Sequence, residues 1–277
     1  MSTYRRRFWE NKTAVVCLAV LAVLTAAAVL APVIAPHDPT QMFPDHRMEG
    51  SSGQFWLGTD QFGRDLFSRI IYGARVSLTV GLLSVLLSAG FGTLFGLIAG
   101  YFGRWMDGLI MRVMDVLFAF PEILLALAIV AALGPGTSNT ILAIGIVNIP
   151  VFTRTVRSAV LSVKNLEFVE SARAIGAGTL RILFLEIFPN VTAPLLVQAT
   201  LAISGAILTE SALSFLGLGI QPPDPSWGGM ISEARRYMEL APGMIVWPCV
   251  TMTVTILAFN MFGDAVRDIL DPKHRNR

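Results

Sequence analysis

Two carboxylates, Glu122 and Glu210, stand out because they lie within or at the end of long apolar stretches. Glu122 follows Pro121 and is the one carboxylate that we expect inside a membrane-length helix, turned toward protein or water rather than lipid. Glu210 comes about 20 residues after Asn190, which at about 1.5 Å per residue places it near the far end of its helix. There it could line a pathway for a solute or meet external water.

The other residue types that carry out chemistry are not grouped. His37, His46 and His274 give no metal-ligand spacing, and Cys17 and Cys249 lie in apolar runs, where cysteine is usually a packing residue. The sequence has no G-x-x-x-x-G-K-[ST] phosphate loop, no H-E-x-x-H and no G-x-S-x-G. We therefore expect no catalytic residue, no metal and no cofactor, and the sequence shows no recognisable means of binding ATP by itself.

The composition is that of a membrane protein. Of the 277 residues, 54% are hydrophobic and 14% are charged, and the mean hydropathy is +0.64. Nothing in it suggests a nucleic-acid partner. We expect an all-α, polytopic protein with six transmembrane helices in contact with membrane lipid.

The apolar stretches predict an N-terminal tail, a first transmembrane helix, an external segment, a five-helix core and a C-terminal tail, with bounds 1–13, 14–36, 37–75, 76–264 and 265–277. The core spans are expected within 76–103, 107–133 with a bend at Pro121, 139–152, 191–209 and 244–262. Arg5-Arg6-Arg7 also resembles the start of a cleaved signal peptide. The apolar run is too long for a signal core and has a poor cleavage site, so we favour an uncleaved anchor.

Small residues predict where two helices approach closely. They recur every four residues along the second span and as a pair in the fifth, namely Ser84, Ser88, Gly92, Gly96, Gly100, and Ala202 with Ala206. Close backbone packing holds helices together in lipid. We expect the stripe to face another helix of this chain, with a seam to another subunit as the alternative.

Before the second span, the sequence from Arg64 onward predicts an amphipathic helix that rests on the membrane. Leu66, Ile70 and Gly73 would share one face, whereas Arg64, Ser68 and Arg75 would be turned away.

A charged segment interrupts the apolar sequence between residues 164 and 190. Asn165 can cap a short helix over 166–175. Phe168, Ala172 and Ile175 would share one face with Val169 beside them, opposite the charged residues Glu167, Glu170 and Arg173. An amphipathic helix on a short connection between two spans suits docking into a partner's groove. The alternative is an ordinary cytoplasmic loop lying on the bilayer surface.

The end of this segment has its own stop and start signals. Gly176 and Gly178 should break the first helix, and Thr179 can cap a second, more apolar helix that Pro189 closes.

Residues 170–189 resemble the loop of ABC-importer permeases written E-A-A-x3-G-x9-I-x-L-P. The positions that match the family spacing are Glu170, Ala172, Gly176 and Pro189. Three positions differ: Ser171 replaces the first Ala, Glu186 replaces Ile, and Phe188 replaces Leu. In that family the loop, which the resemblance places here at 161–189, carries a coupling helix that fits a cleft on the ATPase subunit. The resemblance implies that Glu170, Ser171, Ala172, Gly176 and Pro189 belong to the ATPase-coupling site, with Glu170 holding the helix in place and Gly176 allowing its bend.

Two further blocks sharpen the resemblance. Residues 57–78 are similar to the segment after the first helix in the C-type permease of dipeptide, oligopeptide and nickel importers, and residues 214–228 are similar to the S-F-L-G-L-G-x-Q-P-P-x-P-S-W-G block of peptide permeases. The resemblance implies a type I importer with a MetI-like fold. It implies three kinds of partner: a second homologous permease, two ATPase subunits or domains, and an extracytoplasmic solute-binding protein. The expected substrates are di- or oligopeptides, with nickel, glutathione or another small solute as alternatives.

Positive charge predicts the orientation. With six spans and a cytoplasmic N-terminus, six of the 21 Lys and Arg residues fall outside, namely Arg47, Arg64, Arg69, Arg75, Arg235 and Arg236, and the other fifteen fall inside. Cytoplasmic segments are normally richer in Lys and Arg. We therefore expect a multi-pass protein of the bacterial inner membrane with both termini and the charged segment on the cytoplasmic, ATP-containing side.

Two other classes were weighed. An ion-coupled secondary transporter would need several ionisable residues in mid-span or inverted repeats with broken helices, and beyond Glu122 neither is clear. The second alternative is a non-transporting membrane scaffold or receptor subunit. Co-purification of this chain with an ATPase would distinguish an importer permease from it.

Overall fold

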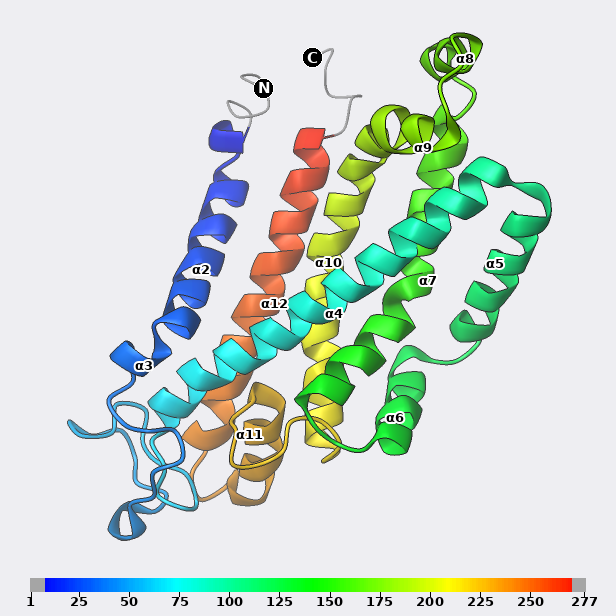
Figure 1. The fold of residues 1–277 in the computed structure, drawn as a ribbon. Coiled ribbons are helices and arrows are strands. Elements are labelled where there is room, and N and C mark those ends of the chain that lie inside the picture. Colours follow the sequence, from blue (N-terminus) through cyan, green and yellow to red (C-terminus); the bar gives the residue numbers. More distant parts are fainter. Residues whose placement is uncertain (1–7, 271–277) are drawn as a thin grey trace.

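The computed structural model describes residues 8–270, and this part of the chain is helical, with a single isolated β-bridge between Thr59 and Asp65. Figure 1 shows long helices running between two ends of the molecule, which we call the α8 end and the α11 end after the short helices found there. The predictions that concern Arg5 to Arg7, His274 and the C-terminal tail beyond residue 270 lie outside the described residues.

The first apolar run forms α2 (Lys12–Val29) and the short helix α3 (Ala31–Ile34), separated by Leu30. The Asn11 side chain accepts a hydrogen bond from the Ala14 backbone N–H at 3.1 Å, and so caps α2. The α2 helix packs along α12 (Gly243–Leu270), whose apolar surface also lies at the edge of the bundle.

The α4 helix (Leu66–Phe102) is 37 residues long and joins two helices that the sequence suggested were separate. Its N-cap is Asp65, whose carboxylate accepts from the Ser68 N–H at 2.9 Å. The expectation that Arg64 and Ser68 turn away from the protein was wrong, because both are buried. Tertiary contacts offset the free-energy cost of burying them. Arg64 forms an ion pair with a residue far along the chain, and Ser68 forms a hydrogen bond with the N-cap residue Asp65.

A sharp break divides the next apolar stretch, as the sequence predicted at Pro121. The α5 helix (Arg104–Phe118) and α6 (Glu122–Leu133) meet at an angle of 89°. Proline has no backbone N–H to continue the helix, and its ring disfavours helical geometry in the residue before it. The two halves therefore form a bent pair rather than one straight span.

The remaining long helices are α7 (Thr137–Val163) and α10 (Phe188–Phe215). The α10 helix continues without interruption from α9 (Thr179–Arg181) through a π-helical turn at Ile182–Ile187. The prediction that Pro189 closes a helix was therefore wrong. The wider turn directly before Pro189 provides room for the proline ring, so the helix can pass through this position. Gly178, not Thr179, is the N-cap of α9.

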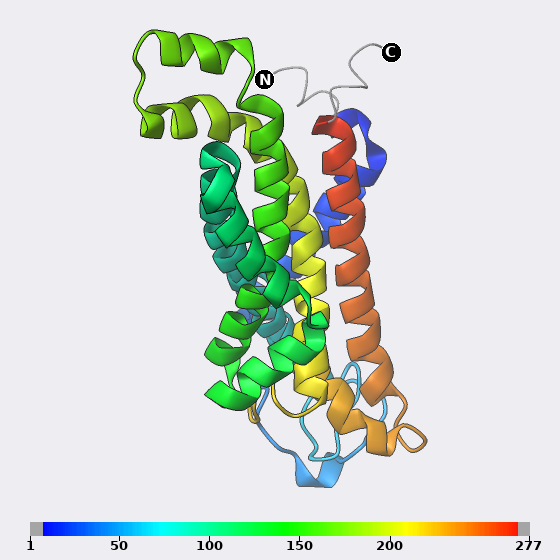
Figure 2. The same ribbon diagram turned by 90° about the vertical axis from the view of Figure 1, so that its right-hand side faces the viewer.

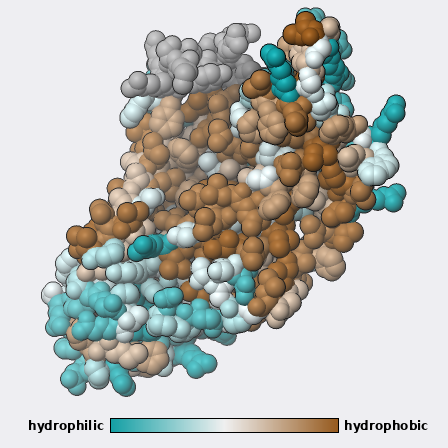
Figure 3. All heavy atoms as spheres, viewed as in Figure 1, coloured by the Kyte–Doolittle hydropathy of each residue, from teal (hydrophilic) through white to brown (hydrophobic). Residues whose placement is uncertain are grey.

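Five helical stretches are long and apolar enough to cross a membrane, and the bent α5–α6 pair makes a sixth, within the described residues. Apolar side chains form a broad band around the middle of the molecule, whereas polar side chains gather at the α11 end and around α8 (Figure 3). The expected all-α, six-span organisation is therefore present, although α4, α7, α10 and α12 all extend beyond the predicted bounds.

The small-residue stripe of α4 packs against α7, which confirms that it serves contact within the chain. Gly92, Gly96 and Gly100 are buried, and a methyl group added at each would collide with α7. At Gly96 the added carbon would lie 2.6 Å from the Val156 Cβ atom and 2.8 Å from the Thr153 carbonyl oxygen. Figures 1 and 2 show α4 crossing α7 along much of its length. Ala202 and Ala206 of α10 are also buried, as predicted, in the central core.

The contact at Gly96 predicts a measurable loss of stability. Gly96→Ala should destabilise the protein by about 1–3 kcal/mol, because the new methyl group forces α4 away from α7. Gly90→Ala on the same helix is the matched control, because an added carbon there meets nothing within 4 Å. Thermal unfolding in detergent should show a lower midpoint for Gly96→Ala and an unchanged or higher one for Gly90→Ala. Equal midpoints for the two variants would show that the close approach does not hold α4 to α7.

Candidate functional site

The predicted docking helix exists as α8 (Glu167–Ala174). It lies outside the helix bundle, at the end where α2 begins and α12 finishes (Figures 1 and 2). Its N-cap is Leu166 rather than Asn165, and no side chain caps it. The acidic residues Glu167 and Glu170 in its first turn instead favour the helix through their charge beside its N-terminus.

One face of α8 anchors it to the bundle. Val169 and Ala172 are buried in a cluster with apolar residues of α4, α7 and the π-helical turn, including Leu97, Val160 and Leu183. The sequence grouped Phe168, Ala172 and Ile175 on one face with Val169 beside them. Of these residues only Val169 and Ala172 are buried, whereas Phe168 is 38% exposed and Ile175 is 81% exposed. The helix therefore presents apolar side chains to the outside while its other face is held by the chain.

Gly176 makes the turn that ends α8. Its φ angle is +82°, a left-handed conformation that favours glycine. The Gly176 N–H donates to the Arg173 carbonyl at 3.0 Å, and the Ala177 N–H donates to the Ala172 carbonyl at 3.0 Å. These two bonds form a Schellman motif, which satisfies carbonyls left free at the helix end. The requirement for glycine is therefore conformational, since an added carbon at Gly176 would meet nothing within 4 Å.

The predicted coupling residues divide into two groups. Glu170, Ser171, Ala172 and Gly176 lie together on α8 and its terminal turn, whereas Pro189 lies outside α8 in the first turn of α10. Glu170 and Ser171 are exposed. Among residues 8–270 no side chain forms an ion pair or hydrogen bond with the Glu170 carboxylate.

Polar contacts tie the base of α8 to the corner between α4 and α5. The Arg157 guanidinium donates to both carboxylate oxygens of Asp107, at 2.5 and 2.6 Å, which joins α7 to α5. The Lys164 ammonium donates to the Gly100 carbonyl at 2.8 Å, and the Arg173 guanidinium lies 5.5 Å from the centre of the Tyr101 ring. These contacts hold the α4–α5 corner against α7 and the end of α8.

Glu210 is fully buried, so in this conformation it meets neither external water nor an open pathway. Its carboxylate accepts from the hydroxyls of Ser77 on α4, Ser214 and Ser211, at 3.0, 2.8 and 3.4 Å. The Ser214 hydroxyl oxygen also accepts from the Ile220 N–H at 3.1 Å. Ser214 thus connects the buried carboxylate to the backbone of the 214–228 block at Ile220.

Glu122 begins α6 and is exposed, but its carboxylate points toward the bundle. One of its oxygens, Oε1, lies 3.3 Å from the Asn148 side-chain nitrogen on α7 and 3.2 Å from the Thr209 hydroxyl on α10. This placement confirms the expectation that Glu122 turns toward protein rather than lipid.

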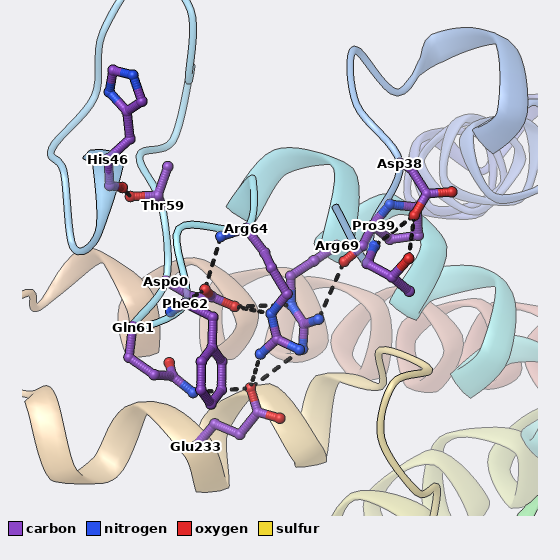
Figure 4. A network of polar contacts seen from close by, with 11 residues as sticks. Asp38, Pro39, His46, Thr59, Asp60, Gln61, Phe62, Arg64, Arg69 and Glu233 are labelled. Carbon is purple, nitrogen blue, oxygen red and sulfur yellow. Dashed lines mark hydrogen bonds and ion pairs between the residues drawn. The ribbon is translucent and has the colours of Figure 1, made fainter. Parts of the chain in front are cut away.

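A buried ion-pair network occupies the α11 end and was not predicted. Arg64 contacts Asp60 at 2.6 Å and Glu233 of α11 (Trp227–Ala234) at 2.7 Å. Arg69 of α4 contacts the same two carboxylates at 3.5 and 3.3 Å and donates to the Pro39 carbonyl. Figure 4 shows both guanidinium groups between the two acids. Two arginines balance two carboxylates, so the charges can be buried while they fasten the 37–65 segment to α4 and α11.

In the sequence, only the resemblance of residues 57–78 to a segment of C-type permeases drew attention to this region. It contains Asp60, Arg64 and Arg69, but the partner Glu233 lies 169 residues beyond Arg64. No periodicity links positions so far apart.

Two family descriptions match the sequence. Residues 92–276 match the family described as "Binding-protein-dependent transport system inner membrane component". Residues 2–51 match "N-terminal TM domain of oligopeptide transport permease C".

Curated relatives match almost the whole chain. The dipeptide transport system permease protein DppC of Alkalihalophilus pseudofirmus is 47% identical over 279 residues, covering 100% of this chain and 92% of that protein. The di/tripeptide transport system permease protein DppC of Pseudomonas aeruginosa is 47% identical, covering 98% and 93%. The glutathione transport system permease protein GsiD of Pectobacterium atrosepticum is 46% identical, covering 97% and 89%.

Two solved structures share the fold. Both are inward-facing structures of the MetNI methionine ABC transporter, with TM-scores of 0.59 and 0.60 and 16% sequence identity. They cover 73% and 74% of this chain and 97% and 98% of the matched chains. This likeness supports the expected MetI-like architecture. The family match over residues 92–276 and the relatives at 47% identity show that the chain belongs to the family of binding-protein-dependent transport system inner membrane components, the permease subunits of ABC importers, whose ATPase activity resides in separate subunits.

Proposed function

We propose that this permease imports short peptides and forms half of the translocation pathway together with a second, homologous permease. The observation that carries the proposal is the identity of 46–47% over nearly the whole chain to permeases named for dipeptides, di/tripeptides and glutathione. These solutes share an amino group, a carboxylate and at least one amide. Nickel or another small solute carried by the same class of importer is the alternative, and the external binding protein would make the first selection.

The proposed mechanism begins at α8. ATP binding closes a pair of ATPase subunits, and α8 moves with the cleft into which it fits. The exposed side chains of Phe168 and Ile175 supply apolar contact with that cleft, and the unpaired Glu170 carboxylate is available to a donor on the ATPase. Because Val169 and Ala172 anchor α8 in the bundle, its movement would pull on α4 and α7 and rock the spans between inward-open and outward-open states.

The proposed orientation places the α8 end in the cytoplasm. The structure gives this idea physical support, because α8, the start of α2 and the end of α12 lie at one end (Figure 1). All six Lys or Arg residues assigned to the outside by sequence lie in the 37–65 segment, the first third of α4 or the region around α11. The orientation follows from the usual enrichment of positive residues on the cytoplasmic side.

The substrate proposal predicts ATP-dependent uptake of dialanine. Vesicles that contain this permease with its partner permease and ATPases, together with its binding protein, should accumulate radiolabelled dialanine when supplied with internal ATP. Unlabelled di- and tripeptides should compete, whereas nickel should not. Uptake of nickel without uptake of dialanine would favour the alternative.

The turn after α8 predicts an uncoupled variant. Gly176→Val forces a β-branched residue into a left-handed conformation, at a cost of about 1–2 kcal/mol, so α8 would lose its fixed direction. We expect peptide uptake to fall by about tenfold or more, because about 1.4 kcal/mol corresponds to a factor of ten in rate. Membrane insertion and complex assembly should be unchanged.

Two variants control for this experiment. Gly178→Val is matched in side chain, but φ at Gly178 is −68°, which valine adopts without strain. Gly176→Asn should retain more uptake than Gly176→Val, because asparagine tolerates the left-handed region. Normal uptake by Gly176→Val would count against the role of this turn in coupling.

The orientation predicts opposite labelling of two exposed sites. In a chain whose Cys17 and Cys249 are replaced by alanine, Ile175→Cys should react with a membrane-impermeant maleimide only in inside-out vesicles. Leu240→Cys, near the α11 end and similarly exposed, should react only in right-side-out vesicles. Labelling of Ile175→Cys from the outside would reverse the proposed topology.

A further inference from the structure

Glu122 is a carboxylate within the apolar part of the molecule, and no residue in the described part of the chain balances its charge. It begins α6 directly after the 89° break. Its neighbour Asn148 lies 11 residues into α7, which at about 1.5 Å per residue is about 16 Å from the helix start at Thr137. An ionisable side chain at this depth is costly unless it faces protein, water or a charged partner.

The contacts of Glu122 leave one of its two carboxylate oxygens, about half of its hydrogen-bonding capacity, free. Asn148 and Thr209 are neutral donors, and at 3.3 and 3.2 Å both reach the same oxygen, Oε1. No Lys, Arg or His among residues 8–270 forms an ion pair with Glu122. By contrast, the membrane-proximal carboxylates of Asp107 and Asp115 are paired with Arg157 and Arg154.

Open space lies on the same face of α10. Gly205 is four residues, or one helical turn, before Thr209, so the two share a face of α10. Gly205 is exposed, and a carbon added there would meet nothing within 4 Å. A solute group beside Glu122 could therefore continue along α10 toward the α8 end without meeting a side chain at Gly205.

We propose that Glu122 binds the protonated amino group of the transported peptide as the peptide passes along α6, α7 and α10. The inference deepens the proposed function and rests on it, since dipeptides, tripeptides and glutathione all carry this group. An ammonium has three N–H donors and one positive charge, which match the free Glu122 oxygen and its unbalanced charge. Asn148 and Thr209 orient the carboxylate from the side opposite the solute.

A cation from the second permease is the competing way to balance Glu122. We commit to the transported ammonium because the solutes for which the relatives are named all carry an amino group. Assembly of the Glu122→Gln variant with the second permease distinguishes the two.

The test compares two solutes in the reconstituted full importer: dialanine and propionyl-alanine, which has nearly the same shape but no amino group. The ratio of their uptake rates is measured for the natural chain and for Glu122→Gln, which keeps the size and hydrogen bonds of the side chain but removes its charge. The same binding protein serves both complexes, so its own selectivity cancels. We expect Glu122→Gln to lower the preference for dialanine by about tenfold or more.

Two variants control the comparison. Glu122→Asp should retain more of the preference than Glu122→Gln because it keeps the charge. Glu239→Gln removes the same charge from an exposed position away from the spans and should leave the preference unchanged. ATPase stimulation by the peptide-loaded binding protein should persist in all three variants, which shows that the complexes are folded and coupled.

The outcomes separate this inference from the proposed function. If the natural importer takes up dialanine and Glu122→Gln keeps the full preference, Glu122 does not bind the ammonium although the peptide assignment stands. If Glu122→Gln instead prevents assembly with the second permease, the carboxylate pairs with that subunit and the inference is wrong. If the natural importer does not transport dialanine at all, the peptide assignment and the ammonium site both fall.

Discussion

The close approach of α4 and α7 is the contact on which the rest of the structure depends. Lipid provides no hydrophobic drive for two apolar helices to associate, so backbone proximity and interlocking side chains must hold them. Gly92, Gly96 and Gly100 provide that proximity, and Val156 and Val160 fill the space left by the missing side chains. The α8 anchor, the α4–α5 corner and the core around Ala202 are all built on this pair.

The length of α4 connects the two functional ends of the permease. Its 37 residues span about 55 Å at about 1.5 Å per residue. Near one end, Leu97 packs in the cluster that anchors α8, and near the other, Arg69 belongs to the network with Asp60 and Glu233. In the proposed mechanism, α4 is therefore the element that connects a movement at α8 to the 37–65 segment and α11.

Local sequence signals predicted the parts of the site that depend on local physics. The four-residue spacing of small residues gave the α4 surface, Pro121 gave the break before Glu122, and the glycine at 176 gave the left-handed turn. Contacts made across the fold could not be predicted in this way. Arg64 was placed facing outward because its partner Glu233 is distant in sequence, and Pro189 was expected to close a helix because a π-helical turn has no simple sequence pattern.

Cross-linking of α8 tests the coupling account most directly. A chain with Phe168→Cys as its only cysteine would be assembled into the full importer and treated with a short bifunctional maleimide, with Leu240→Cys as the matched position at the α11 end. The account predicts that Phe168→Cys forms a product with the combined mass of this permease and one ATPase subunit, and that Leu240→Cys does not. A product between Phe168→Cys and the solute-binding protein, or an ATPase product formed only by Leu240→Cys, would contradict it.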